Sequence, residues 1–257
     1  MAPEPTIHRI LTDDGVELAA AFRGDAAAPV GVILAHGFTM SGDGRRLNGL
    51  AAELAASGRG VYTFDFRGHG HSGGVSSLGD LEILDLDAVI RLARSQQHDK
   101  LVVVGASLGA FVALRHAALL GGEDAIVAIS TPATWGISPR LRARALLATV
   151  RHPLGRRLLS ARGTRVIDRV PVPPMSPSEL ADRITIPVAL VHGEQDPYVP
   201  AADSILLHQR LAGPKRLVIL PRFGHAETAY SPWFAGMVDS LVDELLGGTD
   251  KDVTLQP

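Results

Sequence analysis

The stretch that decides the fold is LVVVGASLGAF, residues 101–111, in which one serine stands between two glycines. The β-branched apolar run at its start predicts a buried strand, and the residues after the serine predict a helix. Because glycine has no Cβ, Gly105 and Gly109 allow the strand and the helix to approach closely around a sharp turn. Ser107 is therefore expected at the tip of the turn, beside a helix N-terminus whose unpaired N–H groups favour negative charge. This setting suits a nucleophilic serine.

Strand-like apolar runs alternate with amphipathic helix patterns along most of the chain. We expect strands at residues 7–11, 16–22, 30–35, 61–66, 101–104, 125–129, 186–191 and 216–220. We expect helices at residues 48–57, 81–92, 201–211 and 232–246, in addition to the one after Ser107. Ser77 and Asp80 are spaced like a capping box, and Ser231 is expected to cap the last helix. The repeated alternation predicts an α/β fold with a mostly parallel sheet and helices on both faces.

Residues 132–183 interrupt this alternation, because no strand is predicted there. We expect them to form an inserted helical cap, with helices at residues 140–150 and 154–159, on a core of residues 1–131 and 184–257. Between Arg140 and Arg169 the segment carries nine arginines and a single acidic residue, Asp168. This composition has two interpretations: a solvated helical face, or a positive field that attracts anionic substrates.

The composition limits the class of protein. A length of 257 residues, 46% of them hydrophobic, suits one α/β domain with an insertion. The formal net charge of −2 gives no general attraction to nucleic acids or membranes, so neither is an expected partner. The sequence has no cysteine, which excludes disulfides and thiolate metal sites. Residues 1–11 lack the apolar core of a secretory signal, and no apolar run reaches transmembrane length, so we expect a cytoplasmic protein.

A serine nucleophile needs a base to accept its proton and a carboxylate to orient that base. Asp196 follows the strand expected at residues 186–191, and His225 follows the strand expected at residues 216–220. Because Ser107 also follows a strand, all three are expected at one edge of a parallel sheet, where the binding sites of such folds lie. Three other acids are less suitably placed: Glu194, Asp65 and Asp85.

The negative charge that develops on the substrate needs two hydrogen-bond donors about 3 Å away. One is expected to be the backbone N–H of Leu108, directly after the nucleophile. The second is expected from the loop after residues 30–35, where Gly37 lets the backbone come close and Phe38 supplies an N–H. Three further side chains are predicted to line the substrate pocket, and each would also suit an ordinary core: Met40, Trp135 and Met175.

No metal or cofactor is expected. His69 and His71 lie close to Asp65 in the sequence, but alternate histidines with one aspartate are a thin set of metal ligands. The glycines of residues 68–74 match neither a phosphate-binding loop nor a dinucleotide-binding motif. We therefore expect this stretch to be a turn beside the site.

These motifs resemble those of the α/β-hydrolase superfamily of serine hydrolases over most of the chain, residues 7–246. The resemblance is carried by His36-Gly37-Phe38, Asp65-Phe66-Arg67-Gly68-His69-Gly70-His71-Ser72, Gly105-Ala106-Ser107-Leu108-Gly109, His192-Gly193-Glu194-Gln195-Asp196 and Gly224-His225. The order Ser, Asp, His is that of the superfamily. Within it, the chain resembles the small carboxylesterases, including cinnamoyl and feruloyl esterases, and the serine aminopeptidase-like hydrolases. Ala106 stands where relatives often have histidine, which leaves the subfamily open.

The resemblance implies a Ser107–His225–Asp196 triad, no cofactor, and a cap that shapes the pocket. The expected reaction is acyl transfer from a small-molecule carboxylic ester to water, with activity falling at acid pH, where an imidazole base is protonated. The same triad serves thioesterases, lactonases and carbon–carbon bond hydrolases, and the fold also serves as a ligand receptor without catalysis. Substrate identity and oligomeric state stay open at the level of sequence.

Overall fold

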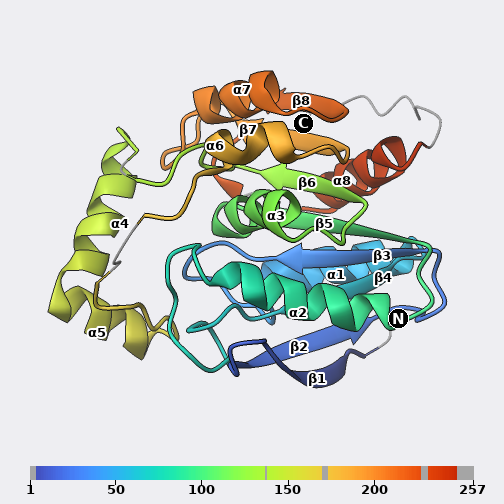
Figure 1. Ribbon diagram of the computed structural model, residues 1–257, viewed down its shortest axis with the longest axis horizontal. Coiled ribbons are helices and arrows are strands. Elements are labelled where there is room, and N and C mark those ends of the chain that lie inside the picture. Colours follow the sequence, from blue (N-terminus) through green and yellow to red (C-terminus); the bar gives the residue numbers. More distant parts are fainter. Residues whose placement is uncertain (1–3, 137, 170–172, 227–230, 248–257) are drawn as a thin grey trace.

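The computed structural model describes residues 4–136, 138–169, 173–226 and 231–247, and these contain one sheet of eight strands (Figure 1). The strand order is β1-β2-β4-β3-β5-β6-β7-β8. β2 pairs antiparallel with β1 and β4, and every other pair is parallel, which confirms the predicted mostly parallel sheet. The strands are β1 (Thr6–Leu11), β2 (Glu17–Arg23), β3 (Val30–Ala35), β4 (Gly60–Phe64), β5 (Lys100–Ala106), β6 (Ala125–Ile129), β7 (Val188–Gly193) and β8 (Lys215–Leu220).

Helices pack on both faces of the sheet, as predicted. One face is covered by α1 (Arg45–Ala56) and α8 (Pro232–Leu245), and the other by α2 (Glu82–Arg94), α3 (Leu108–Leu119) and α7 (Ala201–Arg210). A hydrophobic core lies on each face of the sheet. Alternate residues of a central strand belong to the two cores, because successive side chains point to opposite faces. In β5, Leu101 and Val103 pack with α2 and α3, whereas Val102 and Val104 pack with α1 and α8. Within the described residues no helix is both long and apolar enough to cross a bilayer.

The central strands end at a common edge of the sheet. Ala35 at the end of β3 pairs with Gly105 of β5, and Ile129 at the end of β6 pairs with Ala106. Val191 of β7 pairs with Ile129 in turn. The loops that follow these strands therefore start side by side.

Two helices stand outside the helix layers, at the edge of the sheet toward which β3 and β6 point (Figure 1). They are α4 (Leu141–Arg151) and α5 (Pro153–Ala161), and they confirm the helices predicted between β6 and β7. A small apolar cluster attaches them to the rest of the fold: Val150, Leu159 and Val166 pack against Phe38 and Leu78. This contact holds α4 and α5 next to the loop that follows β3.

Among the residues that the structure describes is a short helix that we did not predict. α6 (Pro177–Leu180) is followed by a 3-10 turn at Ala181–Arg183, before β7. Four residues are too few to give a helical period, but Ser176 and Glu179 form a capping box that marks the start. At α8, the predicted cap is confirmed, because the Ser231 side chain accepts the N–H of Phe234 at 3.3 Å.

The predicted capping box of Ser77 and Asp80 is wrong. Glu82 is fully buried and accepts hydrogen bonds from the hydroxyls of Ser76 and Ser77 at 2.7 and 2.5 Å. The Ser77 hydroxyl in turn accepts the N–H of Leu81, and α2 begins at the next residue, Glu82. A buried carboxylate needs several donors, so Glu82 rather than the local spacing determines this turn.

Candidate active site

Ser107 alone forms the turn between β5 and α3. Its φ of 53° and ψ of −109° lie outside the regions that residues with a Cβ prefer. A Cβ on Gly105 would come within 2.6 Å of the α3 backbone, and a Cβ on Gly109 within 2.1 Å of the carbonyl oxygen of Ala35. Backbone cannot yield easily at these distances, so both positions require glycine, as the sequence predicts.

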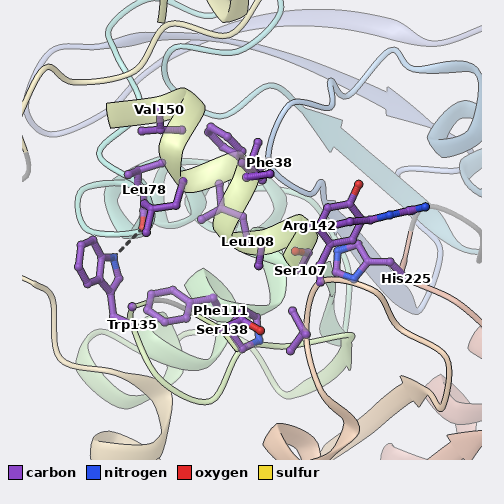
Figure 2. A pocket seen from close by; sticks show the side chains of 18 of the residues that line it. Phe38, Leu78, Ser107, Leu108, Phe111, Trp135, Ser138, Arg142, Val150 and His225 are labelled. Atoms are coloured by element: carbon purple, nitrogen blue, oxygen red, sulfur yellow. Dashed lines mark hydrogen bonds between the residues drawn. The ribbon is translucent and has the colours of Figure 1, made fainter. Parts of the chain in front are cut away.

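The turn is fixed to the neighbouring strand and leaves the serine side chain available. The N–H of Ser107 donates to the carbonyl of Ile129, at the end of β6, at 2.8 Å. The serine side chain makes no capping hydrogen bond to α3. Instead, Ser107 lines a cavity that His225 also lines, and Figure 2 shows both at the same side of that cavity.

His225 and Asp196 form a direct pair. His225 Nδ1 lies 2.7 Å from Asp196 Oδ2, so with that nitrogen protonated the imidazole donates to the carboxylate. His225 follows β8 and Asp196 follows β7, which brings together two residues 29 positions apart in the chain. The His225 ring also packs against Tyr198, with 5.0 Å between ring centroids.

The surroundings of Asp196 keep it ionised. The carboxylate is almost fully buried, and its Oδ1 accepts the N–H groups of Tyr198 and Val199 at 2.8 and 2.9 Å. Burial alone would raise the pKa of Asp196, but its contacts with His192, His225 and Val199 outweigh burial and hold the pKa well below its usual range. An ionised Asp196 can orient the imidazole and stabilise a positive charge on it.

The loop after β3 lies against the serine turn. A Cβ on Gly37 would be 3.6 Å from the Ser107 Cβ and 3.5 Å from the carbonyl oxygen of Ala106, so the two loops are in contact. Within the described part of the chain, neither the N–H of Phe38 nor that of Leu108 has a hydrogen-bond acceptor. These are the two donors expected for the oxyanion, and both residues line the same cavity as Ser107.

His36 holds this loop in place, a role that we did not predict. Its Nδ1 lies 2.8 Å from the carbonyl oxygen of Gly37, and its Nε2 accepts the N–H of Phe66 at 3.0 Å. Burial lowers the pKa of His36 to about 4, so the ring is neutral and can donate at one nitrogen while accepting at the other. The position of His36 directly before Gly37 was the only signal in the sequence.

The cavity has a volume of about 600 Å³ and a largely apolar lining. Among the predicted pocket residues, Trp135 lines it, and the Trp135 indole donates to the carbonyl of Leu78 at 3.1 Å (Figure 2). Met40 and Met175 do not line it. Met40 lies beside Gly37 in the loop after β3, and Met175 is 45% exposed.

The alternative acids have other partners or other places. Asp65 accepts the N–H of Gly42 at 2.6 Å and that of His71 at 2.7 Å. Asp85 forms a buried ion pair with Arg67, and exposed Glu194 is absent from the cavity lining. Within the described ranges, no group of three potential metal ligands lies close together. Nδ1 of His69 contacts the carbonyl oxygen of Arg67.

Comparison with known proteins assigns the family. Residues 32–245 match the sequence model of the Alpha/beta hydrolase family, and the chain belongs to this family. This match spans the strands that carry Ser107, Asp196 and His225 and the loops after them.

The relatives include proteins of known and unknown activity. The chain is 30% identical over 213 residues to a monoacylglycerol lipase of Mycolicibacterium smegmatis, covering 70% of this chain and 75% of the lipase. It is 32% identical over 208 residues to the uncharacterized protein YqkD of Bacillus subtilis, covering 77% of this chain and 65% of YqkD. Among solved structures, the esterase Pf2001 of Pyrococcus furiosus superposes with a TM-score of 0.73 at 25% identity, over 95% of this chain and 92% of that one.

Proposed function

We propose that the protein is a serine hydrolase that cleaves carboxylic esters through an acyl-enzyme. The observation that carries the proposal is the 2.7 Å contact between His225 and buried Asp196, because His225 lines the same cavity as the strained Ser107. Two similar proteins support the choice of ester substrates, because both names denote ester-cleaving enzymes: the monoacylglycerol lipase and the esterase Pf2001.

In the proposed mechanism, Ser107 Oγ attacks the ester carbonyl while Nε2 of His225 accepts the hydroxyl proton. Asp196 holds the imidazole in the required tautomer and stabilises the imidazolium. The backbone N–H groups of Phe38 and Leu108 stabilise the oxyanion, and the N-terminal end of α3 adds a favourable dipole. His225 then gives the proton to the leaving alcohol, and the same residues activate water to release the acid.

We further propose that residues 132–183 act as a cap that shapes the substrate pocket. Support comes from α4, which supplies Arg142, Leu146 and Val150 to the cavity lining. The apolar contact of Val150 with Phe38 also couples the cap to the loop that would hold the oxyanion. A shift of α4 would therefore alter both pocket shape and donor position.

The serine is tested by substitution and by covalent labelling. Ser107→Ala should lower kcat/KM on 4-nitrophenyl esters by about three decades or more while the protein stays folded. A fluorophosphonate probe should label the wild-type protein at Ser107 and leave the variant unlabelled. Near wild-type turnover by Ser107→Ala across a series of acyl chain lengths would refute the mechanism.

The acid is tested against its neighbour. Asp196→Asn should reduce kcat by about three to four decades, because the amide no longer favours the correct tautomer. Glu194→Gln removes an exposed carboxylate two residues away and should change kcat less than twofold. Equal losses in the two variants would show that Asp196 has no special role.

A further inference from the structure

The cavity beside Ser107 has two chemically different sides. Figure 2 shows Leu78, Trp135 and Val150 together on one side, and Arg142 with Ser107 and His225 on the other. The first side is largely apolar near Leu78 and Trp135, because the indole N–H of Trp135 is already bonded to the Leu78 carbonyl. A substrate that spans the cavity therefore meets the apolar groups of Leu78 and Trp135 on one side, and Arg142 with Ser107 and His225 on the other.

Within the described ranges, some arginines of residues 132–183 have a partner for the side chain, and others, Arg142 among them, have none. Arg156 pairs with Asp168 at 2.9 Å, and Arg165 donates to the carbonyl of Gly74 at 3.2 Å. Within the described ranges, Arg142 forms neither an ion pair nor a hydrogen bond with another residue. A guanidinium without a partner, at the rim of a cavity, is available to a ligand.

Among the described residues, Asp203, the acid in the cavity lining, forms no ion pair with Arg142. Asp203 is bonded through its carboxylate to the N–H of Ala133 at 3.0 Å, and burial raises the pKa of Asp203. Arg151 lies at the opposite end of α4, next to Val150 on the apolar side. Beside the serine, Arg142 is thus the cation that a bound anion would meet.

We propose that Arg142 selects esters whose alcohol portion carries an anionic group, a carboxylate or a phosphate. This inference rests on the proposed ester hydrolysis. An apolar acyl chain fits the side of Leu78 and Trp135, so the alcohol portion lies toward Arg142, across the carbonyl that Ser107 attacks. A planar guanidinium can hold a carboxylate or phosphate through two parallel hydrogen bonds.

A matched pair of substrates tests the inference. 4-Nitrophenyl butyrate is neutral, whereas 3-carboxy-4-nitrophenyl butyrate carries one negative charge on the leaving group and has the same acyl chain. Arg142→Gln should lower kcat/KM for the anionic ester about tenfold and change that for the neutral ester less than twofold. Because Arg142 is exposed, raising NaCl from 20 mM to 500 mM should reproduce part of the loss in the wild-type protein only.

Arg144→Gln is the control variant, since it removes the same charge from the same helix at a position outside the cavity lining. It should leave the ratio of the two kcat/KM values unchanged. Equal losses on both esters in Arg142→Gln, or the same selective loss in Arg144→Gln, would overturn the role of Arg142. Failure of the wild-type protein to hydrolyse either ester would instead overturn the proposed function, and the inference with it.

Discussion

Replacing Ser107 by glycine is expected to give a more stable protein than replacing it by alanine, and both variants should be inactive. The backbone of Ser107, at φ 53° and ψ −109°, is a conformation that glycine adopts readily and that a Cβ disfavours. Holding a residue in such a region costs about 1–3 kcal/mol. Glycine removes this strain but adds freedom to the unfolded chain, which costs about 0.5–1 kcal/mol. The net expectation is a gain of about 1 kcal/mol over alanine at the same position.

The comparison with Ser107→Ala isolates the backbone, because both variants lack the hydroxyl and only alanine keeps a Cβ. Urea unfolding of the two variants should give equal m-values and a higher midpoint for Ser107→Gly. Ser240, in the regular helix α8, provides the matched control. There Ser240→Gly should be less stable than Ser240→Ala by about 1 kcal/mol. If Ser107→Gly is no more stable than Ser107→Ala, the serine turn stores no strain and the reasoning is wrong.

Two further predictions concern packing and pH. Gly109→Ala should destabilise the protein by about 3 kcal/mol or more, because its Cβ would lie 2.1 Å from the Ala35 carbonyl oxygen. Gly49 lies in α1 with open space around it, so Gly49→Ala should raise the melting temperature. A Gly109→Ala variant that melts at a higher temperature than Gly49→Ala would contradict the packing argument. Burial lowers the pKa values of His36 and His69 to about 4, so the unfolded chain binds protons that the folded protein does not. Each histidine should therefore lower the free energy of unfolding by about 3 kcal/mol as pH drops from about 6.5 to about 4. Urea unfolding at pH 7, 5.5 and 4.5 measures this, and a constant free energy would rule it out.

Much of the fold follows from local pattern. β3 and β6 have the bounds that their apolar runs predict, because a strand buried on both faces is marked by a continuous stretch of such residues. The serine turn is equally local, since the close approach of β5 and α3 leaves room only for glycine at 105 and 109. The order of Ser107, Asp196 and His225, each after a strand, was also enough to place them at one edge.

Local pattern failed where a distant or buried group determines the structure. Ser77 and Asp80 have the spacing of a capping box, but the Ser77 hydroxyl donates to the buried Glu82 carboxylate instead. This hydrogen bond determines where α2 starts. Met40 and Met175 are apolar and lie in suitable segments, yet neither lines the cavity. Hydrophobic periodicity and motif spacing do not predict which side chain of a loop points into a cavity.

The sequence by itself determined the sheet, the sharp turn at Ser107 and the order of the candidate triad, because each depends on backbone conformation or on strand ends. Only the tertiary structure gave the contact between His225 and buried Asp196, because it depends on how the loops after β7 and β8 meet. It also placed Arg142 in the cavity lining and left Arg144, two residues along the same helix, outside it. That distinction depends on how α4 packs over the carboxyl ends of the strands, which is a contact between segments far apart in the chain.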